Sequence, residues 1–155
     1  MGDWFAVPLW GDAGWAVGVV ARGRGAVVVG YFFGPPRTEV PRLEDVAGYR
    51  PEDAVLSGAF GFLGFKGGSW RILGRLPDWD PVLWPMPRFF RDEPITGRVF
   101  ESFYSEKSPR RFLGERRVSS EEAKGGASDG LMGAEYVEIK LAKLLGVESA
   151  GGASR

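Results

Sequence analysis

The sequence predicts an α+β fold: a mainly antiparallel, strongly curved sheet, either open or curled into a half-open barrel, with one C-terminal helix packed on it. Three observations predict this class. Runs of β-branched and aromatic residues near the N-terminus are apolar on both faces, as strands covered on both sides require. The chain of 155 residues has 24 glycines, which favours turns, bulges and close backbone approach. One stretch, residues 131–145, carries apolar residues at clear helical spacing.

The first three strands are expected to form a meander. They cover Trp4 to Leu9, Trp15 to Arg22 and Ala26 to Phe33. Pro8 cannot donate to a strand ladder, so it indicates a sheet edge or a strand end. The second and third strands are apolar on both faces and should be internal. A glycine-bracketed connection, residues 23–25, makes the hairpin between them.

The middle of the chain mixes turns with shorter strands. The residues around Leu43 and those after Pro51 each favour a single helical turn. Between Val55 and Phe65, a glycine at every third position indicates bulges and a loop rather than a helix. Two further strands are expected, at Trp70 to Leu76 and at Arg98 to Tyr104.

The C-terminal part is predicted to close the same domain. The expected division of the chain is a β-rich core with the aromatic, Pro-rich segment (1–118), a flexible Gly- and Ser-rich linker (119–130), the helix (131–146) and a disordered tail (147–155). Asp129 is the expected N-cap of the helix, and Gly146 the expected stop. The helix should dock its apolar stripe on the sheet, because such a helix is marginal alone.

Composition excludes several classes of protein. The chain has no cysteine and no histidine, which removes disulfides, thiol nucleophiles, the commonest zinc ligand and any Ser-His-Asp mechanism. The formal net charge is zero, from 20 basic and 20 acidic residues, so strong attraction to nucleic acid or anionic membranes is not indicated. There is no signal-peptide pattern and no apolar run of about 18 residues. We expect a cytoplasmic protein with no membrane partner and no cofactor.

The stretch from Gly67 to Phe90 concentrates aromatic residues and prolines. It holds three of the six tryptophans and four of the eleven prolines. Buried aromatic side chains dominate core and interface energetics, and prolines stiffen the backbone that carries them. Most members of one set are expected in the core under the helix: Trp70, Trp84, Phe89 and Phe90. A second, overlapping set is the candidate partner-binding surface, since Trp and Arg are enriched among interface hot spots: Asp78, Trp79, Asp80, Trp84, Arg88 and Arg91.

Two charged clusters have functional alternatives. In an extended segment, Asp78 and Asp80 would point to one side, as a hard cation or an acid–base pair needs. Turn acids beside prolines are the more common explanation. The basic run from Lys107 to Arg117 could follow a nucleic-acid backbone, but two glutamates dilute it, so a solvated loop is favoured. We expect no catalytic residue, no bound metal and no nucleic-acid partner.

Several blocks, in order, resemble a known family. The blocks span most of the chain from Asp3 to Leu145: DWFAVPLWGDAGWAVGVV, VVVGYFF, GGSWRILGRLP, WPMPRFF and GLMGAEYVEIKL. The series resembles the bacterial immunity protein family numbered twenty-six of polymorphic toxin systems. The motif positions carried over are mostly scaffold by residue type: Trp4, Pro8, Gly18, Trp70, Gly74, Trp84, Pro85, Pro87 and Phe89.

The resemblance implies a small α+β protein that binds and neutralises a cognate toxin, made by the same cell and encoded nearby. The family label also carries an association with phosphotriesterase activity, but this sequence lacks the histidines that a familiar metal-dependent phosphotriesterase would use. The favoured prediction is therefore occlusion of the toxin without catalysis. The alternatives are a hydrolase that holds metal with carboxylates only, and a small-ligand or nucleic-acid binding module. An acidic face would suit a basic nuclease toxin: Asp78, Asp80, Asp92, Glu93 and Glu101.

Overall fold

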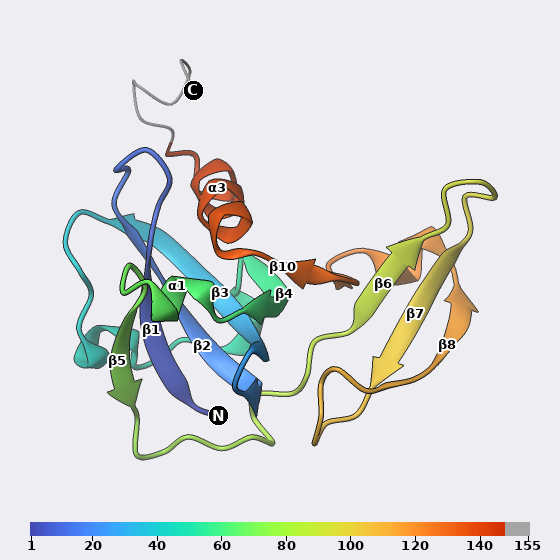
Figure 1. Cartoon of the computed structure of the whole chain (residues 1–155), viewed down its shortest axis with the longest axis horizontal. Helices are drawn as coiled ribbons and strands as arrows, with labels where there is room; N and C mark the ends of the chain where they lie inside the picture. The colour runs from blue at the N-terminus through green and yellow to red at the C-terminus, as the bar shows by residue number, and fades with distance from the viewer. Residues whose placement is uncertain (148–155) are drawn as a thin grey trace.

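The computed structural model describes residues 1–147, and within that range the strands form two sheets (Figure 1). The larger sheet has six strands in the order β10-β4-β3-β2-β1-β5, and the smaller has four in the order β8-β7-β6-β9. Neighbouring strands are antiparallel, except that β10 runs parallel to β4 and β9 runs parallel to β6. The α+β class is confirmed, with the strands divided between two sheets where the sequence predicted one.

The elements have the following bounds. The larger sheet consists of β1 (Asp3–Pro8), β2 (Trp15–Arg24), β3 (Val27–Arg37), β4 (Leu56–Gly61), β5 (Arg71–Arg75) and β10 (Leu131–Met132). The smaller sheet consists of β6 (Phe89–Asp92), β7 (Val99–Tyr104), β8 (Phe112–Val118) and β9 (Ala127–Ser128). The helices are η1 (Leu43–Val46), η2 (Pro51–Asp53), α1 (Leu63–Lys66), α2 (Ser120–Ala123) and α3 (Ala134–Leu144).

The predicted meander is confirmed. β1, β2 and β3 pair in succession, and all three are internal to the sheet. Pro8 is the last residue of β1, where its missing N–H leaves no gap in the ladder. Gly30 of β3 pairs with Val20 of β2, and a Cβ on Gly30 would collide with the carbonyl oxygen of Val19. This glycine is therefore fixed by close backbone approach rather than by a turn.

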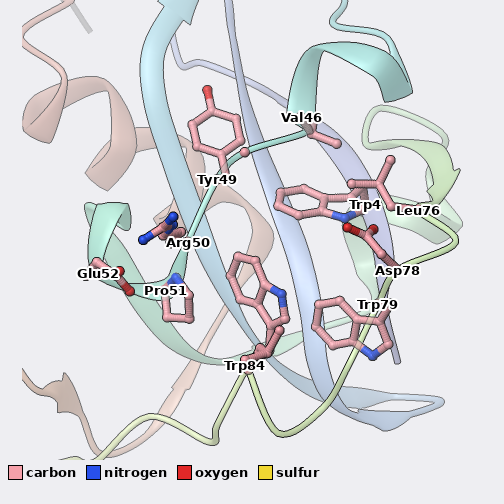
Figure 2. Close-up of a pocket in the computed structure, with 12 residues that line it drawn as sticks. Trp4, Val46, Tyr49, Arg50, Pro51, Glu52, Leu76, Asp78, Trp79 and Trp84 are labelled. Atoms are coloured by element: carbon pink, nitrogen blue, oxygen red, sulfur yellow. The ribbon is translucent and has the colours of Figure 1, made fainter.

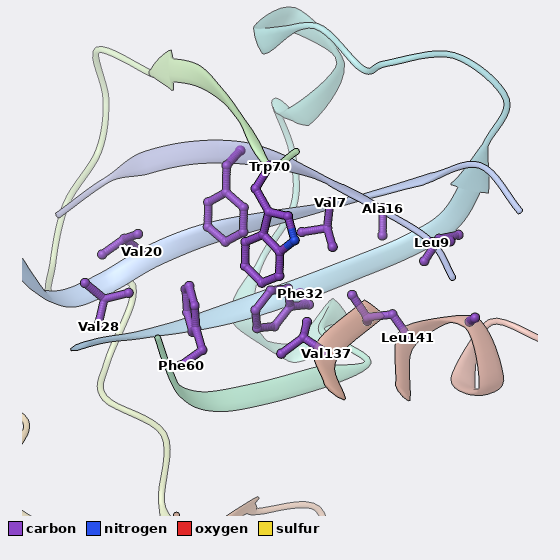
Figure 3. Packing of buried hydrophobic residues seen from close by; sticks show 12 residues of the cluster. Val7, Leu9, Ala16, Val20, Val28, Phe32, Phe60, Trp70, Val137 and Leu141 are labelled. Carbon is purple, nitrogen blue, oxygen red and sulfur yellow. The ribbon is translucent and has the colours of Figure 1, made fainter. Parts of the chain in front are cut away.

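One face of the larger sheet packs against α3 and forms the main core (Figure 3). Trp70, 2% exposed, stacks on Phe5 with ring centroids 5.6 Å apart and the planes 6° from parallel. From the helix, Val137 and Leu141 are fully buried against the same cluster. The predicted docking of the helix is confirmed. Of the four aromatic residues mostly expected under it, only Trp70 belongs to this cluster; Trp84 and Phe89 are buried in the other two clusters, and Phe90 lies on β6, so that expectation is wrong for these three.

The opposite face of the larger sheet holds a second apolar cluster. It consists of alternate residues of β1, β2 and β3 together with η1 and the Pro-rich segment: Trp4, Val17, Val19, Ala21, Tyr31, Phe33, Val46 and Trp84. Period-two alternation places these residues opposite the main core. Both faces of the sheet are thus covered, as the uniformly apolar strands predicted.

Several local predictions differ from the structure. Residues 56–61 form β4 rather than a loop, because this strand is paired with β3 on one side and β10 on the other. Helix α3 begins after Gly133, the observed N-cap, so the predicted N-cap at Asp129 is wrong. Asp129 instead accepts hydrogen bonds from Ser102 and Tyr104 of β7. Gly146 follows the helix at a φ of 68°, which confirms it as the stop.

Residues 119–130 contain α2 and β9. The Ser119 hydroxyl accepts a hydrogen bond from the Glu122 backbone N–H and caps α2. A Cβ on Gly126 would collide with the Phe90 ring, so the small residues of this segment allow it to lie close to β6. The flexibility expected of the segment stays a prediction. Of the predicted disordered tail, residues 148–155 lie outside the described residues.

Candidate functional site

The segment of residues 77–84 crosses the face of the larger sheet opposite α3. It contains successive turns, closed by hydrogen bonds from the Leu83 N–H to the Asp80 carbonyl and from the Trp84 N–H to the Pro81 carbonyl. The Asp80 carboxylate accepts a bond from the Val82 N–H at 2.9 Å. Because the segment turns, the predicted extended geometry, with Asp78 and Asp80 on one side, is wrong. Asp80 is a turn residue, and Asp78 lines a pocket.

Arg22, which the sequence analysis did not select, fixes this segment to the sheet. The residue is only 6% exposed, and its side chain extends from β2 beneath the segment. Nη1 donates to the carbonyl oxygens of Ala21 and Trp84, both at 2.8 Å, and Nη2 donates to that of Pro81 at 3.1 Å. The only sequence signal was an arginine that directly follows the apolar run of β2.

Tyr31 holds the end of the same segment. Its hydroxyl donates to the backbone carbonyl of Pro85. Burial raises the pKa of Tyr31 to about 12, so the phenol stays protonated and remains a donor at physiological pH. Arg22 and Tyr31 together satisfy carbonyl groups of a segment that belongs to no strand, which is how an irregular backbone can be held over an apolar face.

An aromatic pocket of about 470 Å³ opens between the 77–84 segment and the residues of η1 and η2 (Figure 2). Trp79 stacks on Trp84 with centroids 5.4 Å apart and planes at 18°. Trp4 meets Trp84 edge-on at 5.6 Å and stacks on Tyr49 at 6.1 Å. Charged side chains on the pocket wall come from Arg50, Glu52 and Asp78.

Two hydrogen-bond donors of this pocket have no acceptor. Within residues 1–147, the buried indole N–H groups of Trp4 and Trp79 make no hydrogen bond. Most buried polar groups in proteins are paired, and leaving one unpaired costs about 1–3 kcal/mol. The pocket walls therefore include two tryptophans whose buried N–H groups lack an acceptor.

Arg88 lies away from this pocket, on the smaller sheet. Its guanidinium binds Glu101 through Nε at 3.0 Å and Nη2 at 2.9 Å, and it binds Glu122 at 2.7 Å. Arg116 binds the same two glutamates. The hydrogen bond from Arg88 holds the pKa of Glu101 below its ordinary value. Glu101 is 5% exposed, so its assignment to an acidic face is wrong: it is buried as the acceptor of two arginines.

Arg91 is likewise paired. It donates to Glu115 of β8 through Nη2 at 2.7 Å and lies 4.6 Å from the centroid of the Phe100 ring. Of the six predicted site residues, the structure brings Asp78, Trp79 and Trp84 together in one pocket. Asp80 lies in the adjoining turn. Arg88 and Arg91 are separate from the pocket. Arg88 binds Glu101 of β7 and Glu122 of α2, and Arg91 binds Glu115 of β8.

Among residues 1–147, no group of three or more aspartate or glutamate side chains is placed to hold a metal ion. In the same range, none of the helices is long and apolar enough to cross a membrane.

Comparison with known proteins shows the family. The sequence model of the family described as immunity protein 26 matches residues 1–100. That range covers β1 to β6, the 77–84 segment and the start of β7. No curated protein matches the chain, and no solved structure does. Since the match covers most of the chain, including the whole aromatic pocket and the strands that support it, this protein belongs to the immunity protein 26 family.

Proposed function

We propose that this protein is a non-catalytic immunity protein that acts in the cytoplasm and neutralises a cognate toxin by covering the toxin's active site or substrate groove. Membership of the immunity protein family supports the general role. The observation that carries the contact surface is the aromatic pocket with its two unpartnered indole donors, at the border of an exposed apolar segment.

The exposed side chains beside the pocket supply the apolar part of this surface. Val82 is 82% exposed and Leu83 is 64% exposed, and both lie on the 77–84 segment. Leu83 also lines the pocket next to Trp79 and Trp84. Interface hot spots cluster where aromatic anchors and apolar neighbours exclude water together. Such a surface suits a protein partner that places one side chain in the pocket and an apolar patch on Val82.

The two unpaired indole donors indicate that the inserted group must carry a hydrogen-bond acceptor. A carbonyl, amide or carboxylate oxygen from the toxin would accept from the Trp79 or Trp4 indole and remove the cost of an unpaired donor. Both N–H groups are buried in the structure, so such a complex requires a movement of Trp79, which lies on a segment outside the sheets. The surrounding aromatic rings would bury the apolar part of the same side chain.

Co-expression with the toxin encoded beside this gene tests the proposal. We expect a one-to-one complex on affinity purification and restored growth of cells that make the toxin. The double variant Val82→Asp/Leu83→Asp should weaken the complex by about 100-fold, because it places two charges in the apolar part of the interface. Its matched control is Ile95→Asp, which changes a 95% exposed residue in the β6–β7 connection and should leave the affinity unchanged.

The outcomes are distinct. A harmless neighbouring gene product, or the absence of any complex with the wild-type protein, would overturn the immunity function. Full affinity of the double variant would place the toxin on another surface. Both variants change exposed side chains, so their thermal stability should match the wild type and serves as the control for folding.

A further inference from the structure

A basic cleft of about 810 Å³ lies on the other side of the 77–84 segment from the aromatic pocket. It opens between the β2–β3 hairpin, the end of β5 and the loop that joins β7 to β8. Five of its lining side chains are cationic, and Glu106 is the one acidic side chain among them: the cations are Arg22, Arg24, Arg75, Lys107 and Arg110. These charges come from three separate parts of the chain, so folding brings them together.

The positive charge of the cleft is poorly neutralised. Within residues 1–147, Arg24, Lys107 and Arg110 make no ion pair. Arg75 reaches Asp3 only at 3.9 Å. The nearest carboxylate to Arg22 is that of Glu106, at 3.7 Å, and this side chain is 67% exposed.

Arg22 is the buried cation of the cleft. Its guanidinium is buried and is held by three backbone carbonyls, which satisfy N–H donors but do not neutralise the charge. Buried arginines are ordinarily paired with an acid, because an uncompensated buried charge is costly. The cleft thus has a buried cation at its base, whose one acidic neighbour is the exposed Glu106, and three unpaired cations around it.

The cleft adjoins the aromatic pocket through a shared segment. Pro81 lines the cleft, Leu83 and Trp84 line the pocket, and the exposed Val82 lies between them in sequence. One partner that covers residues 77–84 therefore reaches both. We propose that the basic cleft binds a run of aspartate and glutamate side chains on the toxin. This inference rests on the proposed function, and it reverses the partner charge that the predicted acidic face would favour.

A protein is favoured over nucleic acid as the source of the anion. The formal net charge of the chain is zero, whereas binding along a nucleic-acid backbone needs an extended basic surface. The three unpaired cations of the cleft lie beside an apolar, aromatic surface. Carboxylates that meet these cations would both raise the association rate and fix the orientation of the complex.

Charge reversal at the three unpaired cations tests the inference in the complex. The variant Arg24→Glu/Lys107→Glu/Arg110→Glu should bind the toxin about 100-fold more weakly at low salt, and the loss should shrink as salt rises. The control Arg98→Glu/Arg117→Glu/Lys143→Glu makes the same change in net charge at exposed positions elsewhere and should bind like the wild type. If both variants bind like the wild type, the cleft inference fails while the immunity function stands.

A titration of the immunity protein alone tests the cleft without the toxin. Hexaglutamate peptide should shift the backbone NMR signals of Gly23, Arg24, Ser108 and Arg110, and the triple variant should abolish these shifts. No shift with hexaglutamate would overturn the inference. Tighter binding of a single-stranded RNA of about eight nucleotides at the same signals would also overturn it, in favour of a nucleic-acid site. If wild-type protein does not bind the toxin at all, the proposed function fails, and with it the identity of the partner.

Discussion

Arg22 has two roles in the structure, one in holding a segment and one in a charged cleft. Two of its three carbonyl acceptors belong to the 77–84 segment and hold it on the sheet, and its charge forms the base of the basic cleft. The acceptors at Pro81 and Trp84 are 59 and 62 positions away in sequence. A single buried side chain therefore sets the shape of both halves of the proposed interface.

Replacing Arg22 by methionine should lower the free energy of unfolding by about 2 kcal/mol, because the carbonyls of Pro81 and Trp84 lose a buried donor. The change is measured by denaturant unfolding. The control is Arg24→Met on the same strand, where the exposed side chain has no hydrogen bond in the described range and should cost less than about 0.5 kcal/mol. Equal stability of the two variants would show that Arg22 does not hold the segment.

At the scale of single residues, the sequence predicted which side chains are buried better than it predicted which groups they contact. Trp70 and Trp84 could be identified as core residues from their size and apolar surroundings, and both are buried. The role of Arg22 could not be predicted, because an arginine at the end of an apolar run does not reveal which distant carbonyls it will meet. Arg88 and Glu101 show the same limit, since their pairing depends on the register of β6 with β7.

At the scale of elements, α3 combines a predictable stripe with an unpredicted polar contact. Val137 and Leu141 dock the helix, as their spacing indicated. The Trp70 indole also donates to the Glu138 carboxylate at 2.9 Å, and this bond joins the helix to the main core. Burial raises the pKa of Glu138, while the bond from Trp70 opposes the rise. The helix period could not show this contact, because Trp70 lies 68 positions earlier.

The raised pKa predicts a pH dependence. The folded protein holds the Glu138 proton more tightly than the unfolded chain does, so stability from this group is full below the ordinary carboxyl pKa and is lost as pH rises through the folded value. Glu138→Gln keeps an oxygen for Trp70 and removes the charge. At pH 7 we expect this variant to be more stable than the wild type by less than about 1 kcal/mol, with the difference vanishing near pH 4.

Thermal unfolding between pH 4 and pH 7 measures this effect. Glu39→Gln, at an exposed carboxylate in a bend, is the matched control and should leave the pH profile unchanged. A Glu138→Gln variant that is less stable than the wild type at pH 7 would mean that the ionised carboxylate is the better acceptor for Trp70, contrary to the prediction.

At the scale of the whole molecule, two sheets share one small apolar junction. Phe89 of β6 and Ala127 of β9 pack on Val29 of β3. The chain then passes from β9 to β10 through Asp129 and Gly130 alone, and so joins the smaller sheet to the larger one. The smaller sheet was not predicted, because β8 reads as a polar, basic stretch and β9 has two residues. Only the pairing partners, distant in sequence, reveal that these residues form strands.

The junction predicts how the molecule opens. Phe89 is 3% exposed and contacts Tyr104 edge-on at 5.5 Å, so Phe89→Ala should cost about 3–5 kcal/mol and act mainly at this junction. In hydrogen exchange, amides of β6 and β7 should lose protection in this variant before those of β2 and β3, because the larger sheet keeps its own two cores.

The matched control is Phe112→Ala on the same sheet, at a side chain that is 53% exposed, with an expected cost below about 1 kcal/mol. Equal loss of protection in both sheets of the Phe89 variant would instead show that the two sheets unfold as one cooperative unit, and the 77–84 segment, which lies between β5 and β6 in sequence, would then share that stability.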